Sequence, residues 1–541
     1  MVIPVVKKET KNGRKFKTPE KITYSYKTVD KSNAARLGAE AFASFAEGAE
    51  LFESGAFVVF ELDESLENKA EIYRVVISSD GIRVGFRDER GALNGAATVA
   101  LMLRKELLEE GEILDYPSCA YRSFMIDMAR GLPTYEDIEM TVRYMALAKF
   151  NRLHLHLIDS KGPCYLSDAV PEYKFIGRGE ACDKVFLRRI AELCRSYSIE
   201  IIPEIEVPAH ATALCKAHPE FKCDVEDAHA WTLCPGSEGI WEFFDALIGE
   251  IADIFPESEY IHIGSDEIEL LDFPKPQKCH WAECPKCAAL REKNRLADRQ
   301  SEFYYLIERI YGIVRAYGKK MIMWNDQIDV SKNGPDSLSR DILIEFWRIA
   351  APGRGPYEGC TFEKFLEQGF NIVNAYYPYA YFESEESTSA EKLKDWTPFN
   401  EPEQSEKYAS LVLGGEACAW EFGNYQDYPF YSYVTPSVVA MFGDKLWGLG
   451  SRDYSDESAE GRKYREALSE FIFGSAEYTD VFDFVGGLIP PRSAEKFTYA
   501  DVDKISRDRL LECINRVGAN KTSPVSEKYV YLLSKIEESV K

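Results

Sequence analysis

The sequence predicts an α/β protein whose centre is a (β/α)8 barrel of the TIM type. Two observations predict this fold. Short apolar strands alternate with amphipathic helices eight times over roughly 330 residues, the order of elements in such a barrel. The strands are also apolar on both faces, as parallel strands covered by helices are. An open doubly wound sheet is the alternative, but no Gly-x-Gly-x-x-Gly follows an early strand, so a nucleotide-binding fold has little support.

Residues 1–118 are expected to form a small α+β domain in front of the barrel. Apolar runs predict strands at 56–62, 71–77 and 82–86, and Asp80-Gly81 predicts a hairpin turn between the last two. The spacing of apolar side chains predicts an amphipathic helix over 91–109. Because this domain carries no obvious chemistry, we expect it to support the barrel.

The barrel is expected over residues 119–454 and a helical region over 455–541. Apolar runs predict the eight strands at 124–128, 153–158, 199–205, 260–264, 321–324, 342–346, 372–375 and 411–414. Amphipathic patterns predict helices between them at 136–149, 183–197, 238–253, 298–317 and 432–447. Charged helical patterns at 458–473, 501–517 and 526–540 predict a C-terminal region that packs against the barrel.

Composition narrows the class of protein. The 541 residues are 45% hydrophobic and 29% charged, which is typical of a soluble globular chain. The net charge of −25 argues against binding to nucleic acid or to anionic membranes, because phosphates would be repelled. No apolar run is long enough for a signal peptide or a membrane span, and thirteen cysteines lack the spacing of a disulfide scaffold, so a cytoplasmic protein is expected. The sequence leaves a homodimer open.

The strongest chemical signal is the acid pair Asp266 and Glu267, which follows the strand predicted at 260–264. Side chains alternate along a strand, so two adjacent acids can share a pocket only where the strand breaks up. Active sites of parallel α/β folds lie at these carboxyl ends. Acidic neighbours are common in a chain with 90 acidic residues and usually lie on solvated surface, so the strand context is what singles out this pair.

Polar and aromatic residues near the other strands join the acid pair as candidates for one site. A set rich in carboxylates and tryptophans suits a polyol that stacks on flat rings and is held by hydrogen bonds, which describes a sugar. The candidates are Arg122, Asp159, His210, Trp324, Trp347, Tyr379 and Trp420.

A metal-activated hydrolase is the competing interpretation. His154-x-His156, together with His210, His262 and Asp266, is similar to the metal cage of barrel hydrolases that activate water. In those enzymes the His-x-His pair lies on the first barrel strand, whereas here it lies on the second. Histidines on a buried strand are more often satisfied core residues, so the cage is disfavoured.

Several motifs, in order over about 300 residues, resemble those of the family 20 glycoside hydrolases, the β-N-acetylhexosaminidases. The first domain, which ends in Ile113-Leu114-Asp115-Tyr116-Pro117, also resembles the small domain that precedes the barrel in that family. The barrel motifs are Tyr121 to Arg130 (YRSFMIDMAR), Lys149 to Asp159 (KFNRLHLHLID), Pro203 to His210 (PEIEVPAH), His262 to Glu267 (HIGSDE) and Gly414 to Trp420 (GGEACAW).

The resemblance implies an exo-acting enzyme that hydrolyses terminal β-linked N-acetylglucosamine or N-acetylgalactosamine on an oligosaccharide or glycoconjugate. Such enzymes retain configuration without a protein nucleophile, because the substrate's own 2-acetamido oxygen attacks the anomeric carbon. Glu267 would be the general acid and then the base, and Asp266 would stabilise the acetamido group as it becomes an oxazolinium ion. The implied reaction requires no cofactor.

The resemblance also implies roles for the other candidates. Tyr379 would donate to the acetamido oxygen, and Trp324, Trp347 and Trp420 would wall its pocket. Arg122 would bind sugar hydroxyls, whereas Asp159 and His210 would support the acid. For a single tryptophan, core packing is an equally common role.

Three positions depart from the family pattern. Ser265 stands where the family has a second glycine before the acid pair, and Tyr381 stands where an aspartate is common. Phe422 occupies a position that usually holds a glutamate, with Glu421 one place earlier as the available sugar ligand. These changes leave the preference for gluco, galacto or 6-substituted sugars open. They also leave a non-catalytic sugar-binding protein on the same barrel as the alternative function.

A group of cysteines lies outside the resemblance. Cys279-His280 is followed by Cys284 and Cys287 in the segment after the acid pair. Cys-x-x-Cys is a common half-site for structural zinc, so Cys279, Cys284 and Cys287 are candidate ligands. Because no second well-spaced Cys-x-x-Cys is present, free loop cysteines are the equally weighted alternative.

Overall fold

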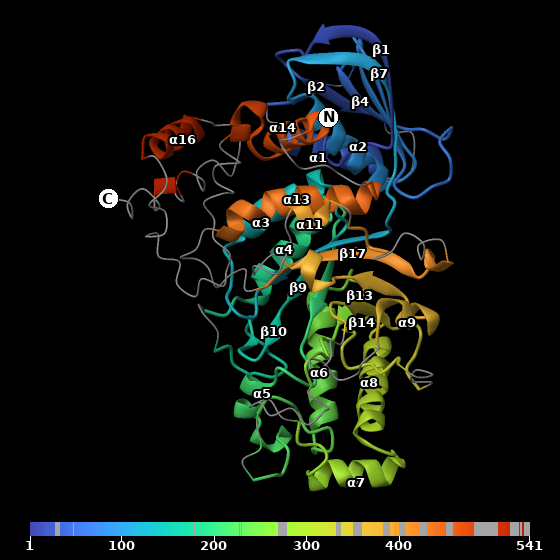
Figure 1. Ribbon diagram of the computed structural model, residues 1–541, viewed down its shortest axis with the longest axis vertical. Coiled ribbons are helices and arrows are strands. Elements are labelled where there is room, and N and C mark those ends of the chain that lie inside the picture. Colours follow the sequence, from blue (N-terminus) through green and yellow to red (C-terminus); the bar gives the residue numbers. More distant parts are fainter. Residues whose placement is uncertain are drawn as a thin grey trace.

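A computed structural model of the chain contains a small amino-terminal domain, a barrel and helices beside both (Figure 1). The structure describes residues 1–27, 33–46, 48–52, 54–176, 180–226, 228, 230–268, 279–331, 337–349, 360–381, 390–394, 396–399, 407–420, 430–450, 458–480, 507–519, 530 and 533–534. Among these residues, no helix is both long enough and apolar enough to cross a membrane.

Eight parallel strands close into the predicted barrel. Each predicted strand is present within a few residues of its expected position, because runs of apolar, often β-branched residues favour buried parallel strands. In chain order the strands are β8 (Tyr121–Asp127), β9 (Arg152–His156), β12 (Glu200–Glu204), β13 (Tyr260–His262), β14 (Lys320–Trp324), β15 (Leu343–Phe346), β16 (Ile372–Asn374) and β17 (Val412–Ala419).

The predicted helices also form, and capping residues explain where several begin. The side chains of Thr134, Asp183 and Asp298 each accept a hydrogen bond from a backbone N–H in the first turn of a helix. The long helices of the barrel are α3 (Tyr135–Leu147), α4 (Lys184–Ser196), α6 (Ile240–Ile254), α8 (Arg299–Ala316) and α13 (Phe430–Gly448). Shorter helices include α5 (Thr212–Ala217), α7 (Pro285–Asn294), α9 (Phe362–Glu367), α10 (Tyr377–Ala380) and α11 (Ala390–Leu393).

The amino-terminal domain is a seven-stranded sheet with two helices. In spatial order its strands are β1 (Lys8–Lys17), β7 (Leu107–Asp115), β5 (Tyr73–Ser78), β6 (Gly81–Phe86), β4 (Val58–Leu62), β2 (Thr23–Tyr26) and β3 (Glu50–Leu51), and its helices are α1 (Ala34–Phe45) and α2 (Glu89–Met102). The expected helix over 91–109 is therefore wrong in its second half. Residues from Leu107 onward form β7 because they pair with both β1 and β5, and these ladder hydrogen bonds outweigh the local helical pattern.

The two domains meet at the amino ends of the barrel strands through buried charges. Arg122 on β8 contacts the carboxylate of Glu71 from the small domain. Lys149, after α3, lies 2.9 Å from Asp115 at the end of β7, and Tyr73 donates to the same carboxylate at 2.6 Å. The carboxyl ends of the barrel strands consequently point away from the small domain.

Two described helices represent the C-terminal region. Helix α14 (Ala459–Phe473) matches the helix expected at 458–473, and α16 (Arg507–Ala519) overlaps the one expected at 501–517. The helix expected at 526–540 falls almost entirely outside the described residues. Helix α14 contacts both domains, because Arg104 of the small domain donates to its Glu470 carbonyl at 2.8 Å and Tyr144 of α3 donates to the carbonyl of Ile472 at 2.9 Å.

Candidate active site

The acid pair follows the fourth barrel strand, where the chain leaves β13 through a sharp turn. The backbone φ angles of Gly264, Ser265 and Glu267 are 66°, 74° and 50°, which lie in the left-handed region that residues other than glycine rarely adopt. This turn brings both carboxylates to one place: the Nε2 atom of His210 lies 3.6 Å from Asp266 and 3.6 Å from Glu267. A regular strand would send the two side chains to opposite faces.

The two residues before the acid pair are fixed for different reasons. A Cβ atom at Gly264 would lie 2.0 Å from the Oε2 atom of Glu206, so this position has no room for a side chain. Ser265, which replaces the second glycine of the family motif, is fully buried and donates from Oγ to the carbonyl of Val207 at 2.6 Å. That hydrogen bond holds the serine in its left-handed conformation, so the departure does not disturb the turn.

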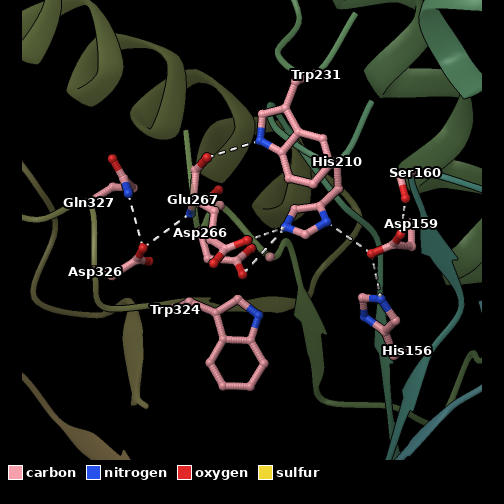
Figure 2. A network of polar contacts seen from close by, with 12 residues as sticks. His156, Asp159, Ser160, His210, Trp231, Asp266, Glu267, Trp324, Asp326 and Gln327 are labelled. Atoms are coloured by element: carbon pink, nitrogen blue, oxygen red, sulfur yellow. Dashed lines mark hydrogen bonds and ion pairs between the residues drawn. The ribbon is translucent and has the colours of Figure 1, made fainter. Parts of the chain in front are cut away.

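His210 lies between the acid pair and the buried carboxylate of Asp159, as Figure 2 shows. Its Nδ1 atom lies 3.0 Å from Asp159, at the loop after β9. Asp159 also accepts from Arg130 at 2.9 Å, and the imidazole packs on Trp231 with ring centroids 4.3 Å apart. The predicted group of Asp159, His210, Asp266 and Glu267 is thus brought together, and Trp231 and Arg130 join it.

Burial and neighbouring charges shift the pKa values of Glu267 and His210. Burial and the Asp266 carboxylate raise the pKa of Glu267, although His210 and Arg348 offset part of this rise. Burial would lower the pKa of His210, but the carboxylates of Asp159 and Asp266 hold it well above its usual range. A raised pKa favours the protonated form of Glu267, which suits a group that must donate a proton.

The backbone of Glu267 is held from two sides. Its carbonyl accepts a hydrogen bond from Nε1 of Trp231 at 3.0 Å, and its N–H donates to Asp326 at 3.1 Å (Figure 2). Asp326 follows β14 and accepts from the guanidinium of Arg348, after β15, at 2.5 Å. Three strand ends and one loop therefore fix the position of this single residue.

A cluster of aromatic rings lies beside the acid pair. Tyr381 stacks on Trp347 with centroids 6.2 Å apart and planes at 3°, and its edge meets Trp420 at 5.7 Å. Trp420 in turn contacts Trp324 at 6.0 Å. The Nε1 atoms of Trp347 and Trp420 are buried and have no hydrogen-bond partner among the described residues. We call these four residues the aromatic pocket.

Beneath the pocket, the barrel interior carries a layer of paired histidines and glutamates. His154 lies 2.8 Å from Glu416, and His262 lies 3.0 Å from Glu204 and 3.4 Å from Glu345. All five side chains are fully buried. Glu204 also accepts from the indole of Trp324 at 2.8 Å, so this ionic layer supports the floor of the aromatic pocket.

The ionic layer explains the histidines of the disfavoured metal cage. His154 and His262 belong to it, and His156 contacts Glu204 and lies 3.3 Å from Asp159. His210 and Asp266 lie instead at the mouth of the site. The five residues thus divide between two levels of the barrel. Each core histidine lies within 3.4 Å of a carboxylate, although the Nε2 atoms of His154 and His262 make no hydrogen bond among the described residues.

Arg122 does not lie in the site, and its expected role in sugar binding is wrong. Tyr121 faces the barrel interior with Ile202 and Ile322, so the next residue on the strand points outward. Arg122 is 1% exposed and contacts Glu71 at the domain interface. Arg130, at the other end of the same motif, is the arginine that reaches the site. The alternation of side chains along β8 was the signal in the sequence that could have excluded Arg122 from the site.

The structure also changes the assignment of the tyrosine. The ring of Tyr379 packs on Tyr376 at 6.0 Å and on Trp396 at 6.4 Å, whereas Tyr381 lies in the aromatic pocket. Tyr381, first noted as a departure from the family pattern, therefore occupies the position expected for Tyr379. Glu421 and Phe422 lie outside the described residues.

Glu206 is a further site residue that sequence reasoning passed over. Its side chain lies under Gly264 and near Asp266, and its Oε2 atom has no hydrogen-bond partner among the described residues. Burial and the charge of Asp266 raise the pKa of Glu206 well above its usual range, which favours the protonated form of this carboxyl. A neutral acid beneath Asp266 avoids adding a second buried negative charge there.

The cysteines that come together in the structure differ from the set that the sequence predicts. Cys284 and Cys287 meet Cys223 and Cys234, whereas Cys279 is buried outside this group. His280 lies 3.1 Å from Glu283. The predicted ligand set of Cys279, Cys284 and Cys287 is therefore wrong in its first member, and two cysteines distant in sequence complete the group.

Comparisons with known proteins agree with this geometry. The family model described as glycosyl hydrolase family 20, catalytic domain, matches residues 119–447, and the model of domain 2 of that family matches residues 1–116. A β-hexosaminidase of Akkermansia muciniphila is 25% identical over 434 residues, which cover 72% of this chain and 83% of the relative. A β-hexosaminidase of Porphyromonas gingivalis is 25% identical over 504 residues, which cover 84% of this chain but only 61% of the relative.

Solved structures share the fold. The exo-β-N-acetylglucosaminidase of Vibrio harveyi in complex with N-acetylglucosamine has a TM-score of 0.71 at 20% identity and covers 90% of this chain and 77% of its own. The β-N-acetylhexosaminidase of Bacteroides fragilis has a TM-score of 0.70 at 21% identity, with 87% and 94% covered.

Proposed function

The chain belongs to glycosyl hydrolase family 20, and on this premise we propose that it is an exo-acting β-N-acetylhexosaminidase. Its substrates would be oligosaccharides or glycoconjugates that end in β-linked N-acetylglucosamine or N-acetylgalactosamine. One observation carries the proposal. The adjacent carboxylates of Asp266 and Glu267 meet at His210 beside the aromatic pocket, and the pKa of Glu267 is raised.

The proposed reaction is retaining and substrate-assisted. In the first step the acetamido oxygen of the substrate forms a bond to the anomeric carbon, while the glycosidic bond breaks and Glu267 protonates the departing oxygen. In the second step water forms a bond to the anomeric carbon of the oxazolinium ion while the bond from that carbon to the acetamido oxygen breaks, and Glu267 takes the proton from that water. The raised pKa of Glu267 supports both steps, because the same carboxyl must be protonated first and ionised later.

Asp266 would accept a hydrogen bond from the acetamido N–H and stabilise the positive charge of the oxazolinium ion. The Nε2 atom of His210 lies 3.6 Å from this carboxylate and 3.6 Å from that of Glu267, so it holds the two acids side by side. Burial and the charge of Asp266 raise the pKa of Glu206 beneath it, which favours a protonated Glu206 that adds no competing charge.

The aromatic pocket would hold the acetamido methyl group between flat apolar walls. Tyr381 is the group that we propose as the donor to the acetamido oxygen, because its ring lies between Trp347 and Trp420. Arg130 would bind sugar hydroxyls in place of Arg122. Its guanidinium lies 5.1 Å from the centre of the Trp420 ring and is anchored by Asp127 and Asp159, each at 2.9 Å.

We further propose that this reaction uses no cofactor and takes place in the cytoplasm. The acid, the base and the stabilising carboxylate come from the chain, and the nucleophile comes from the substrate. The thiols of Cys223, Cys234, Cys284 and Cys287 support a reducing compartment, since oxidation would break up their cluster. Light scattering of the purified chain would test whether it forms a homodimer.

The direct test compares nitrophenyl β-glycosides of N-acetylglucosamine, N-acetylgalactosamine and glucose. We expect rapid release of nitrophenol from the two acetamido sugars and none above background from the glucoside, because the glucoside lacks the internal nucleophile. A thiazoline analogue of the oxazolinium ion should inhibit competitively. If the folded protein turns over no acetamido glycoside yet binds N-acetylglucosamine, the enzyme proposal fails in favour of a sugar-binding protein.

A further inference from the structure

Four thiols meet in one buried cluster at a distance from the acid pair. The Sγ atoms of Cys223, Cys234, Cys284 and Cys287 all lie within 4.8 Å of one another. The Sγ atom of Cys234 lies 3.6 Å from that of Cys284 and 3.5 Å from that of Cys287. Disulfide sulfurs are separated by only about 2 Å, so these sulfurs are not placed for disulfide bonds.

The spacing matches the corners of a tetrahedron around one metal ion. With a zinc–sulfur distance of about 2.3 Å, tetrahedral geometry separates the sulfurs by about 3.8 Å. We infer that Cys223, Cys234, Cys284 and Cys287 bind one structural zinc ion as a four-cysteine site. Four thiolates and no exchangeable ligand make a closed site, which stabilises structure without activating water.

The local structure brings each pair of ligands together. Cys284 and Cys287 form a Cys-x-x-Cys half-site at the start of α7, where Cys284 precedes the first helical residue, Pro285. The second pair lies in the loop between β12 and α6, and it is joined because the N–H of Cys234 donates to the carbonyl of Phe221 at 2.8 Å. The ten residues between Cys223 and Cys234 hide this half-site from a search for short motifs.

The two half-sites also pack against each other through contacts of the surrounding chain. Trp281, fully buried, donates from Nε1 to the carbonyl of Leu233 at 2.7 Å. A Cβ atom at Gly236 would lie 2.4 Å from the carbonyl oxygen of Lys286. One side-chain hydrogen bond and one close approach of two backbone segments therefore join the half-sites, and they hold the four thiols together.

The zinc would join two segments that carry the active site. The loop from β12 holds His210 and then Trp231, three residues before the ligand Cys234. The indole of Trp231 donates to the carbonyl of Glu267, at the start of the segment that ends in α7. In Figure 1, α7 lies at the end of the molecule opposite the small domain. The metal would thus position Trp231 and Glu267 relative to each other rather than take part in the reaction.

Metal analysis of the purified full-length chain, without added metal, tests the inference. We expect one zinc per chain, and X-ray absorption at the zinc edge should show four sulfur ligands at about 2.3 Å. This measurement needs no variant, so a failure of folding cannot obscure it. Zinc well below one per chain, iron in its place, or nitrogen and oxygen ligands would overturn the proposal.

Two variants sharpen the test. Cys234→Ser should lower the zinc content to a small fraction of one per chain and lower the melting temperature. Cys279→Ser is the matched control, because Cys279 is as buried as Cys234 and precedes the ligand Cys284 by a few residues but lies outside the cluster. It should keep the full zinc content. Equal zinc in both variants would contradict the assignment, and the hydrolase proposal would stand or fall independently.

Discussion

Arg122 and Glu71 form an ion pair that is buried between the barrel and the small domain. The guanidinium also donates from Nε to the carbonyl of Lys149 at 2.7 Å and from Nη1 to that of Cys119 at 2.6 Å. Every one of these contacts is structural. The arginine that the family resemblance assigned to the substrate therefore holds two domains together.

Arg122→Met should reduce stability while leaving the chemistry of the folded protein nearly unchanged. Breaking a buried pair from one side costs about 3–5 kcal/mol, because Glu71 is left unpaired. Arg130→Met should instead raise KM strongly with a smaller change in melting temperature. Thermal unfolding and steady-state kinetics of both variants test these two roles. If KM rose for Arg122→Met and not for Arg130→Met, Arg122 would be the arginine that binds the sugar.

The pH dependence of kcat/KM should report the raised pKa of Glu267. Activity falls as pH rises through this pKa, because the general acid must be protonated in the first step. The charge of Arg348 lowers that pKa. Arg348→Gln should therefore move the alkaline limb of the profile to higher pH, although the lost contact with Asp326 also reduces kcat. A limb that moves to lower pH would contradict this electrostatic account.

Tyr381→Phe should lower kcat about 10²-fold or more, since removing one donor to a developing charge typically has an effect of this size. Tyr379→Phe is the matched control and should change kcat less than about threefold. Each variant removes one phenolic hydroxyl, and the two tyrosines are only two residues apart. The opposite ranking would restore Tyr379 as the donor.

Gly264→Ala should inactivate the protein or prevent its folding, because the new methyl group would meet the carboxyl of Glu206. Ser265→Gly is the informative comparison. It keeps the turn conformation and loses only the hydrogen bond to Val207, which costs about 1 kcal/mol. We expect its kcat to stay within a few-fold of the parent value, and a loss as large as that of Gly264→Ala would show a specific role for the serine.

The ionic layer should make the fold sensitive to alkali. Burial alone would lower the pKa values of His154 and His156, but Glu416 and Glu204 raise them to about 10 and about 9. Because these folded-state values exceed the unfolded value of about 6.5, their stabilising contribution is complete below that pH. It is lost as pH rises through 9 to 10. Urea unfolding between pH 6 and pH 10 should show this decline, and His154→Gln should flatten it.

The barrel could be predicted well from the sequence because an apolar run marks each of its strands. All eight apolar runs became strands, and the acid pair fell at a carboxyl end because a glycine breaks the strand before it. The second half of the helix expected at 91–109 failed because pairing with β1 and β5 is a long-range effect that local periodicity does not contain.

Within the site, the errors came from matching motifs without geometry. Arg122 and Arg130 belong to one motif, and only the alternation of side chains along β8 separates them. Tyr379 lies in the short helix α10 whereas Tyr381 directly follows it, so an offset of two residues decides which ring enters the pocket. Cys223 and Cys234 were not foreseen as partners of the Cys-x-x-Cys pair, because the fold alone brings them to it.

The contacts of Arg104 have a consequence for biosynthesis. This half-buried side chain in the small domain donates to the carbonyls of Glu470 and Phe471, and the backbone N–H of Val5 donates to Asp444. A ribosome has made the whole small domain long before it makes these acceptors. The domain must therefore wait for more than 300 further residues before its interface is complete, so a chaperone that shields this surface during translation would help the nascent chain.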